Sequence, residues 1–355
     1  MHPGPRIDSL NVILKGLLLS LSLSLALTPS AQATQLVPEE KAFAFDKISP
    51  QGKAAIETFR QSYREFLTRE LSSHDAATQA DITQVFEQCL DNSYADDLMA
   101  SNRLLIQLNE KYPKEPVILW HLAVNYFIVA RRLPEDQLDE QIKLLRKGFN
   151  KSKECLSITQ KNPDCWLTYA ASHGALALAE GIFDTISEIS DVQDEMHKAY
   201  DILTKEKDRC PMAPWGVDSK HVALGALAEY YRLAPDWWLF KLLSGVRGDK
   251  EKSWHYAAKM KVNDVSTANI AARSAMCLGA NTDDQKLIDQ GIALMAKGMT
   301  FELLHPFDEA EYRRLARLYN AVAKLNNPDP DDYYDLACVE FGNDDKSALK
   351  DKSSK

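Results

Sequence analysis

Hydrophobic residues recur at helical spacing along most of the chain. Between Gln51 and Leu71, apolar side chains fall three or four positions apart, at Ala55, Ile56, Phe59, Tyr63, Phe66 and Leu67. This period places them on one face of a helix. Runs of Val, Ile and Thr that alternate with polar residues, which would indicate strands, do not occur. We therefore expect an all-α protein.

The same period predicts a series of helices separated by prolines and polar turns. Pro113 closes one helix, and Pro163 opens another, because proline has no N–H to lose at a first helical position. The expected helices span residues 51–71, 77–90, 94–112, 117–130, 137–157, 163–180, 192–207, 266–279, 283–298, 307–325 and 331–341. Another starts near 217–219 and includes Tyr231, and a further one falls in the stretch 248–260.

The stretch 162–174 has the clearest packing pattern. Trp166, Tyr169, Ala170 and His173 give one helix face the order bulky, bulky, small, bulky. This spacing resembles the first helix of a tetratricopeptide repeat. Comparable helix starts at 116, 163, 217 and 266 are 47, 54 and 49 residues apart, whereas that repeat spans about 34 residues. The resemblance implies an α-solenoid of tetratricopeptide-like helix pairs with an N-terminal helical cap.

This fold divides the chain into five segments. We expect a signal peptide at 1–33, an arm and helical cap at 34–115, the helix-pair array at 116–300, C-terminal capping helices at 301–342 and a disordered tail at 343–355.

The first 33 residues have the pattern of a cleavable signal peptide. Arg6 and Lys15 supply positive charge, residues 16–27 form an apolar run, and residues 31–33 are a small-x-small cleavage site. We expect a mature chain that begins at Thr34, is periplasmic or secreted, and has no stable membrane span. The alternative is an uncleaved N-terminal anchor.

The charge balance argues against a nucleic-acid partner. The chain has 42 Lys and Arg residues against 51 Asp and Glu residues, a net charge of −9. Nucleic acid is bound by clustered basic residues, whereas here both signs are interspersed.

Six cysteines accompany the expected export, and six cysteines allow 15 pairings. We expect a disulfide between Cys155 and Cys165, which flank one helix-helix turn. The alternative is that all six are buried apolar residues. Without a C-x-x-C pair, the sequence offers no zinc or dithiol-redox motif.

In tetratricopeptide-like arrays, the first helix of each pair lines a concave groove where partners bind. By this resemblance the groove residues are Trp120, Val124, Phe127, Leu167, Ala171, Glu229 and Arg232. The apolar first half of such a groove would be covered by the N-terminal helices or by an apolar ligand. The alternative is that these side chains simply pack in the core.

The sequence contains no recognisable catalytic motif. The histidines are scattered, and there is no H-E-x-x-H, P-loop, G-x-S-x-G or dinucleotide fingerprint. Asp236 beside Trp237 and Trp238 offers a sugar site or, alternatively, a hydrophobic plug. We expect a non-enzymatic protein without cofactors. It should bind a partner protein or a small ligand, and it could form a homo-oligomer.

Residues 166–175, 227–231 and 248–252 resemble the helical accessory component of tripartite ATP-independent periplasmic transporters. That resemblance implies a soluble, oligomeric helper that handles a small apolar or acidic ligand beside a solute-binding protein. Members are often lipoproteins, but the first cysteine here is Cys89. The rival hypothesis is a glycoside hydrolase or lyase of the double-ring helical barrel type, which needs two carboxylates about 5–10 Å apart; Glu229 and Asp236 are the residues that would test it.

Overall fold

The computed structural model describes residues 36–133, 135–180, 189–205, 211–212, 217–234 and 247–338. The chain divides into two units, residues 1–36 and residues 37–355. The expected signal peptide and tail lie outside the described residues, as do Asp236, Trp237 and Trp238. All of the structure below belongs to the second unit.

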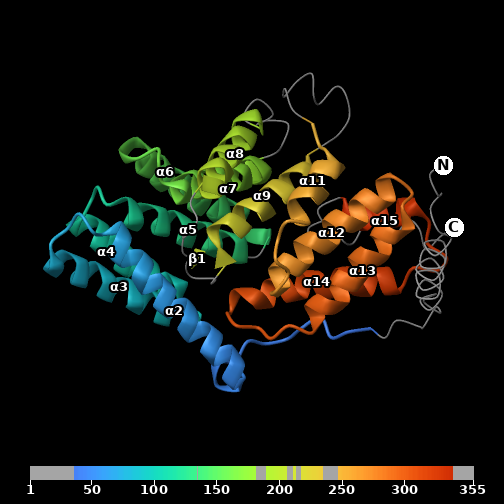
Figure 1. Cartoon of the computed structure of the whole chain (residues 1–355), viewed down its shortest axis with the longest axis horizontal. Coiled ribbons are helices and arrows are strands. Elements are labelled where there is room, and N and C mark those ends of the chain that lie inside the picture. The colour runs from blue at the N-terminus through green and yellow to red at the C-terminus, as the bar shows by residue number, and fades with distance from the viewer. Residues whose placement is uncertain are drawn as a thin grey trace, which may run out of the picture. The chain divides into compact units, whose positions relative to one another are not determined.

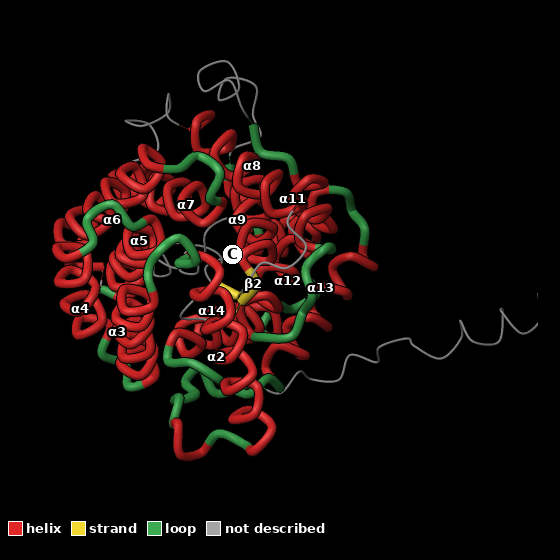
Figure 2. Tube along the Cα trace, turned by 60° about the vertical axis from the view of Figure 1, so that its left-hand side comes forward, coloured by secondary structure: helices red, strands yellow, loops and turns green. Residues whose placement is uncertain are grey.

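The described chain is almost entirely helical (Figure 2). The N-terminal elements are η2 (Phe45–Lys47), α2 (Pro50–Glu70), α3 (Ala76–Tyr94) and α4 (Leu98–Lys111). Four helix pairs follow: α5 (Pro116–Arg132) and α6 (Leu138–Ile158), α7 (Pro163–Glu180) and α8 (Ile189–Lys205), α9 (Ser219–Leu233) and α11 (Lys250–Ala257), and α12 (Val265–Asn281) and α13 (Gln285–Met299). The short helix η3 (Glu135–Gln137) lies between α5 and α6. The chain then forms α14 (Phe307–Ala323) and α15 (Pro330–Ala337).

Two short strands were not predicted. β1 (Pro211–Met212) pairs antiparallel with β2 (Val217–Asp218). Two residues are too few to produce an alternating pattern, so the sequence carries no signal for them.

Local capping fixes where the helices begin. The Asp97 side chain accepts a hydrogen bond from the Ala100 N–H at 2.8 Å, and Asp96 turns the chain with a φ of 62°. These two residues explain why α3 continues to Tyr94 and α4 begins at Leu98, whereas the periodicity predicted a break after Leu90. An N-cap that satisfies a free N–H marks a helix start more sharply than hydrophobic spacing does.

The helices pack in chain order, as in an α-solenoid. Each helix of the pairs contacts the next along the chain, and the first helices α5, α7, α9, α12 and α14 contact one another in succession (Figure 1). The all-α solenoid predicted from the sequence is therefore confirmed.

The first and last parts of this unit are also in contact. The Phe307 N–H donates to His305 Nδ1 at 3.0 Å, so the Nε2 atom of His305 carries the proton. The Nε2–H group of His305 donates to the Ser93 hydroxyl of α3 at 2.7 Å. A hydrogen bond between buried groups 212 positions apart fixes α3 against the connection before α14.

Two disulfides cross-link the described chain. Cys155 of α6 is joined to Cys165 of α7, and Cys277 of α12 is joined to Cys338, the residue after α15. The first is the pair expected from the sequence; the second was one of the pairings left open. Cys89 has a free, buried thiol.

Candidate functional site

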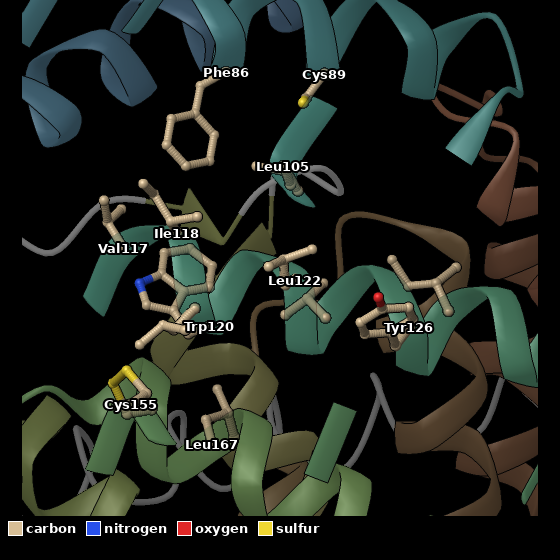
Figure 3. Close-up of a cluster of buried hydrophobic side chains, with 14 of the residues drawn as sticks. Phe86, Cys89, Leu105, Val117, Ile118, Trp120, Leu122, Tyr126, Cys155 and Leu167 are labelled. Atoms are coloured by element: carbon tan, nitrogen blue, oxygen red, sulfur yellow. A yellow bond between two sulfur atoms is a disulfide. The ribbon is translucent and has the colours of Figure 1, made fainter. Parts of the chain in front are cut away.

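The first half of the predicted groove lies in the core. Trp120 is 1% exposed, and Val124 and Leu167 are also buried. The Phe66 ring of α2 packs edge-on against the Trp120 indole, with centroids 6.2 Å apart. Figure 3 shows Trp120 between Phe86 on one side and Cys155 and Leu167 on the other. Trp120, Val124 and Leu167 are therefore not groove surface.

The sequence explains this burial. Helix α5 is apolar around almost its whole circumference, as expected of a helix enclosed by others. Of the two coverings considered, the N-terminal helices or an apolar ligand, the structure shows α2 against this face. Phe127 and Ala171 are partly buried, and Phe127 packs against the same core cluster.

The second half of the predicted groove forms an ion pair. Arg232 is 0% exposed. Its Nε atom and one terminal nitrogen donate to the two carboxylate oxygens of Glu229 at 3.1 and 2.5 Å. Its other terminal nitrogen donates to the carbonyl oxygen of Ala337 at 2.7 Å. Arg232 thus fastens the end of α15 to α9, and it is not available on a groove surface.

This pair belongs to a larger set of polar residues on α9, α12 and α14, which we call the inner charged cluster: Glu229, Arg232, Asn269, Arg273, Glu311 and Arg314. The Asn269 amide donates to Glu311 at 3.2 Å, and Arg314 donates to the same carboxylate at 2.8 Å. Burial raises the pKa of Glu229, but the Arg232, Arg273 and Arg314 guanidinium groups lower it more, so the pKa lies below its ordinary value. A network of this kind orients three helices.

Sequence reasoning found two residues of the inner charged cluster and missed the other four. Asn269 and Arg273 stand four positions apart in α12, an otherwise small and apolar helix that is buried along most of its length. Polar residues at that spacing on a buried helix face are a usable signal, because they require partners on neighbouring helices.

A different surface is defined by the residues before α2. We call residues 37–49 the arm, and we call Phe301, Glu302, Glu309, Tyr312, Arg317 and Asn320 the arm-docking face. The Asn320 side chain accepts a hydrogen bond from the Val37 N–H and donates one to the Val37 carbonyl oxygen, both at 2.9 Å. Figure 1 shows the arm, in blue, passing α14 before it enters α2.

Two glutamates capture further N–H groups of the arm. The Glu309 carboxylate accepts from the Phe43 N–H at 2.6 Å. The Glu302 carboxylate accepts from the Ser49 N–H at 2.5 Å and from the Ser49 hydroxyl at 2.7 Å. These bonds from Ser49 lower the pKa of Glu302. The arm is therefore bound mainly through its backbone.

The arm and the inner charged cluster meet different sides of α14. At 100° per residue, the arm-docking residues of α14 (Glu309, Tyr312, Arg317 and Asn320) fall within an arc of about 140° around the helix axis. Glu311 and Arg314 lie in the remaining arc, roughly 140–200° away from Glu309. Helix α14 thus joins an internal network to a surface that holds an extended segment.

Two further buried groups, the His121 imidazole and the Cys89 thiol, are of a type that can carry chemistry. His121 donates through Nδ1 to the Val117 carbonyl oxygen at 2.6 Å, which leaves Nε2 to accept from the Tyr63 hydroxyl. Burial lowers the pKa of His121 to about 3 and raises the pKa of the Cys89 thiol to about 12. Within the described ranges, no three His, Cys, Asp or Glu side chains are grouped to hold a metal ion. The same part of the chain has no helix that combines the length and apolar content needed to cross a membrane.

Comparison with known proteins gives one family-level match. The family model for regulator of microtubule dynamics protein 1-3 matches residues 83–209, which run from within α3 to just beyond α8. This is less than half of the chain, and it includes neither α14 nor any residue of the inner charged cluster. The search of curated proteins returns no match.

Proposed function

We propose that this chain is a non-enzymatic helical-repeat protein that binds an extended segment of a partner protein at the arm-docking face. The observation that carries the proposal is the pair of hydrogen bonds between Asn320 and the backbone of Val37. Backbone N–H and C=O groups are the same in every polypeptide. A side chain that uses both therefore selects an extended conformation, which a segment of another chain can also present.

The arm is bound in a way that permits exchange. Its residues 38–42 are exposed, and Val37 and Phe43 are only partly buried. Segments with few buried contacts open locally at low cost in free energy. A partner segment therefore competes with a weakly held stretch of this chain and not with a packed core.

The proposed setting is the cell envelope or the exterior. The signal-peptide pattern at residues 1–33 supports it. So do the two disulfides, because disulfides persist mainly in oxidising compartments. An accessory role beside a transporter, which the sequence resemblance implies, fits that setting, and the partner segment would then belong to another exported protein.

The test uses a labelled peptide of residues 37–47 and the full chain carrying Val37→Pro and Phe43→Pro. These changes remove the two arm N–H groups that donate to Asn320 and Glu309. We expect this variant to bind the peptide at least tenfold more tightly than the wild-type chain does, measured by fluorescence anisotropy. Adding Asn320→Ala should weaken the peptide's affinity about tenfold, the worth of one or two hydrogen bonds.

Asn150→Ala is the matched control, because Asn150 is an exposed asparagine on α6, away from the arm-docking face. It should leave the affinity for the peptide unchanged. If the proline variant folds, as judged by circular dichroism, and binds no peptide, the proposed function is wrong.

The family-level match supports a second candidate function. The matching model describes regulators of microtubule dynamics and covers α3 to α8. If this segment acts in that way, the full chain will co-sediment with polymerised tubulin. Recovery of the chain in the supernatant at all tubulin concentrations would remove this candidate.

A further inference from the structure

The arm presents every second residue to α14. Val37, Glu39, Lys41 and Phe43 are two positions apart, and each of them contacts α14, although the chain bends at Glu39. Their partners on α14 are, in the same order, Asn320, Arg317, Tyr312 and Glu309.

This order fixes a direction. As the arm advances from Val37 to Phe43, its partners move backwards along α14, so the arm runs antiparallel to the helix. Six residues of chain reach at most about 20 Å, and the 11 positions from Asn320 to Glu309 cover roughly 16–17 Å of helix. The arm, which bends at Glu39, is therefore long enough to contact all four residues of α14.

The middle of the contact involves charge. Glu39 lies 3.7 Å from the Arg317 guanidinium. The Lys41 ammonium lies 5.3 Å from the centre of the Tyr312 ring and donates to the Phe301 carbonyl oxygen at 2.8 Å. A carboxylate suits Arg317, and a cation suits an aromatic face beside a carbonyl oxygen.

The two ends of the contact are apolar. The Val37 and Phe43 side chains pack, partly buried, against the hydrophobic cluster of α12 to α15. Apolar side chains at both ends and opposite charges between them amount to a four-position pattern, in addition to the backbone bonds.

We propose, resting on the function above, that the partner segment carries apolar, acidic, basic and aromatic side chains at four successive alternate positions and binds antiparallel to α14. The arm is an intramolecular copy of that segment, and it covers the arm-docking face until the partner displaces it. Backbone bonds supply affinity for any extended segment, and the charges select among segments.

The charged contacts should favour the matching segment by a modest factor in affinity. The Glu39 and Arg317 side chains remain 47% and 44% exposed, and an exposed pair of this kind adds only modestly to affinity. Reversal of both peptide charges should nevertheless weaken binding at two positions. A cation at position 39 would face Arg317, and an anion at position 41 would face the Tyr312 ring and the Phe301 carbonyl oxygen.

The experiment compares two peptides of residues 37–47 on the full chain that carries Val37→Pro and Phe43→Pro. One peptide has the natural sequence, and the other carries Glu39→Arg and Lys41→Glu, with the same composition of charge. We expect the charge-reversed peptide to bind at least fivefold more weakly. When Arg317→Glu is added to the chain, the preference between a natural and a Glu39→Arg peptide should invert.

The two proposals fail in different ways. Equal binding of both peptides overturns the charge pattern and leaves the proposed function standing, whereas absence of peptide binding overturns both. A wild-type dimer that the natural peptide dissociates, measured by light scattering, would show that the face holds the arm of a second copy and overturn the partner assignment.

The wild-type chain gives an independent measurement. Saturating natural peptide should speed hydrogen exchange at the Val37 and Phe43 amides at least fivefold, because displacement of the arm frees both N–H groups. Unchanged exchange at both amides would overturn competition between arm and partner.

Discussion

Arg232 and Ala337, 105 positions apart, are joined by a hydrogen bond of 2.7 Å from the guanidinium to the last carbonyl oxygen of α15. The same guanidinium makes two bonds to Glu229. One fully buried side chain therefore holds two helices, and the Glu229 carboxylate pairs with its charge.

Arg232→Met should lower the free energy of unfolding by about 3–5 kcal/mol, because it leaves Glu229 without its closest counter-charge and Ala337 without a donor. Urea unfolding at pH 7 measures the change. Lys143→Met is the control: its side chain is 61% exposed in an i,i+3 pair with Glu140, so we expect a loss below about 1 kcal/mol. A loss of similar size for both variants would contradict the structural role of Arg232.

The sequence predicted the helices well and these contacts poorly. Periodicity and proline placed α2 and α7 within a residue or two, because both signals are local. The same reasoning put Arg232 on a groove, since its helix position faces the inner side. Its burial depends on α15, whose approach has no trace in the sequence near Arg232.

The arm shows the same limit more strongly. Residues 34–49 lack the hydrophobic periodicity of the helices. The hydrogen bonds that hold residues 37–49 come from α14 and from the connection before it, and Val37 and Asn320 are 283 positions apart. Hydrogen bonds to the backbone of the arm set no requirement on its residue types, so these bonds leave no signal in the arm sequence.

A second prediction concerns the contact of α12 with α13. A Cβ added at Gly291 would lie 2.3 Å from Met276 Cγ and 2.7 Å from the Ala272 carbonyl oxygen. Gly291→Ala should therefore force the helices apart and cost about 1–3 kcal/mol in the free energy of unfolding.

Gly174→Ala is the matched control for this change. Gly174 also lies inside a helix, and its added Cβ would meet only Val192 Cγ1, at 3.3 Å. The gain in helix propensity, up to about 1 kcal/mol, should offset this contact, so thermal unfolding should show a nearly unchanged or raised Tm. A Tm for Gly291→Ala equal to the wild-type value would show that the two helices are not closely packed.

The two disulfides should differ in their effect on stability. Cys277 and Cys338 are 61 positions apart, and Cys155 and Cys165 are 10 apart. The chain-entropy model gives about 4 kcal/mol for the long loop and about 2.8 kcal/mol for the short one. Replacement of both cysteines of each pair by alanine, followed by urea unfolding, should reproduce this order; the reverse order would contradict it.

A prediction of pH dependence comes from Asp308 at the start of α14. Its carboxylate accepts the Leu304 and His305 N–H groups, but burial raises its pKa to about 7. Because the folded pKa exceeds the ordinary value of 3.8, the stabilising contribution is complete below that value and is lost as the pH rises through about 7.

Asp308→Asn, which stays neutral and can still accept both N–H groups, should therefore gain stability relative to the wild type between pH 5 and pH 8, on the order of 1–3 kcal/mol. Urea unfolding at several pH values measures the difference. Asp331→Asn, at an exposed position of α15, should show no such trend. A difference between Asp308→Asn and the wild type that is constant with pH would contradict the raised pKa.

The distance in sequence between Val37 and Asn320 also has a consequence for synthesis. The arm leaves the ribosome long before α14, because Asn320 is added some 283 residues after Val37, which takes roughly 15–60 s at typical elongation rates. Throughout that interval the nascent arm has no docking face and is open to chaperones, export factors or neighbouring chains. Its first encounter is therefore with other molecules, and only the finished protein can hold it.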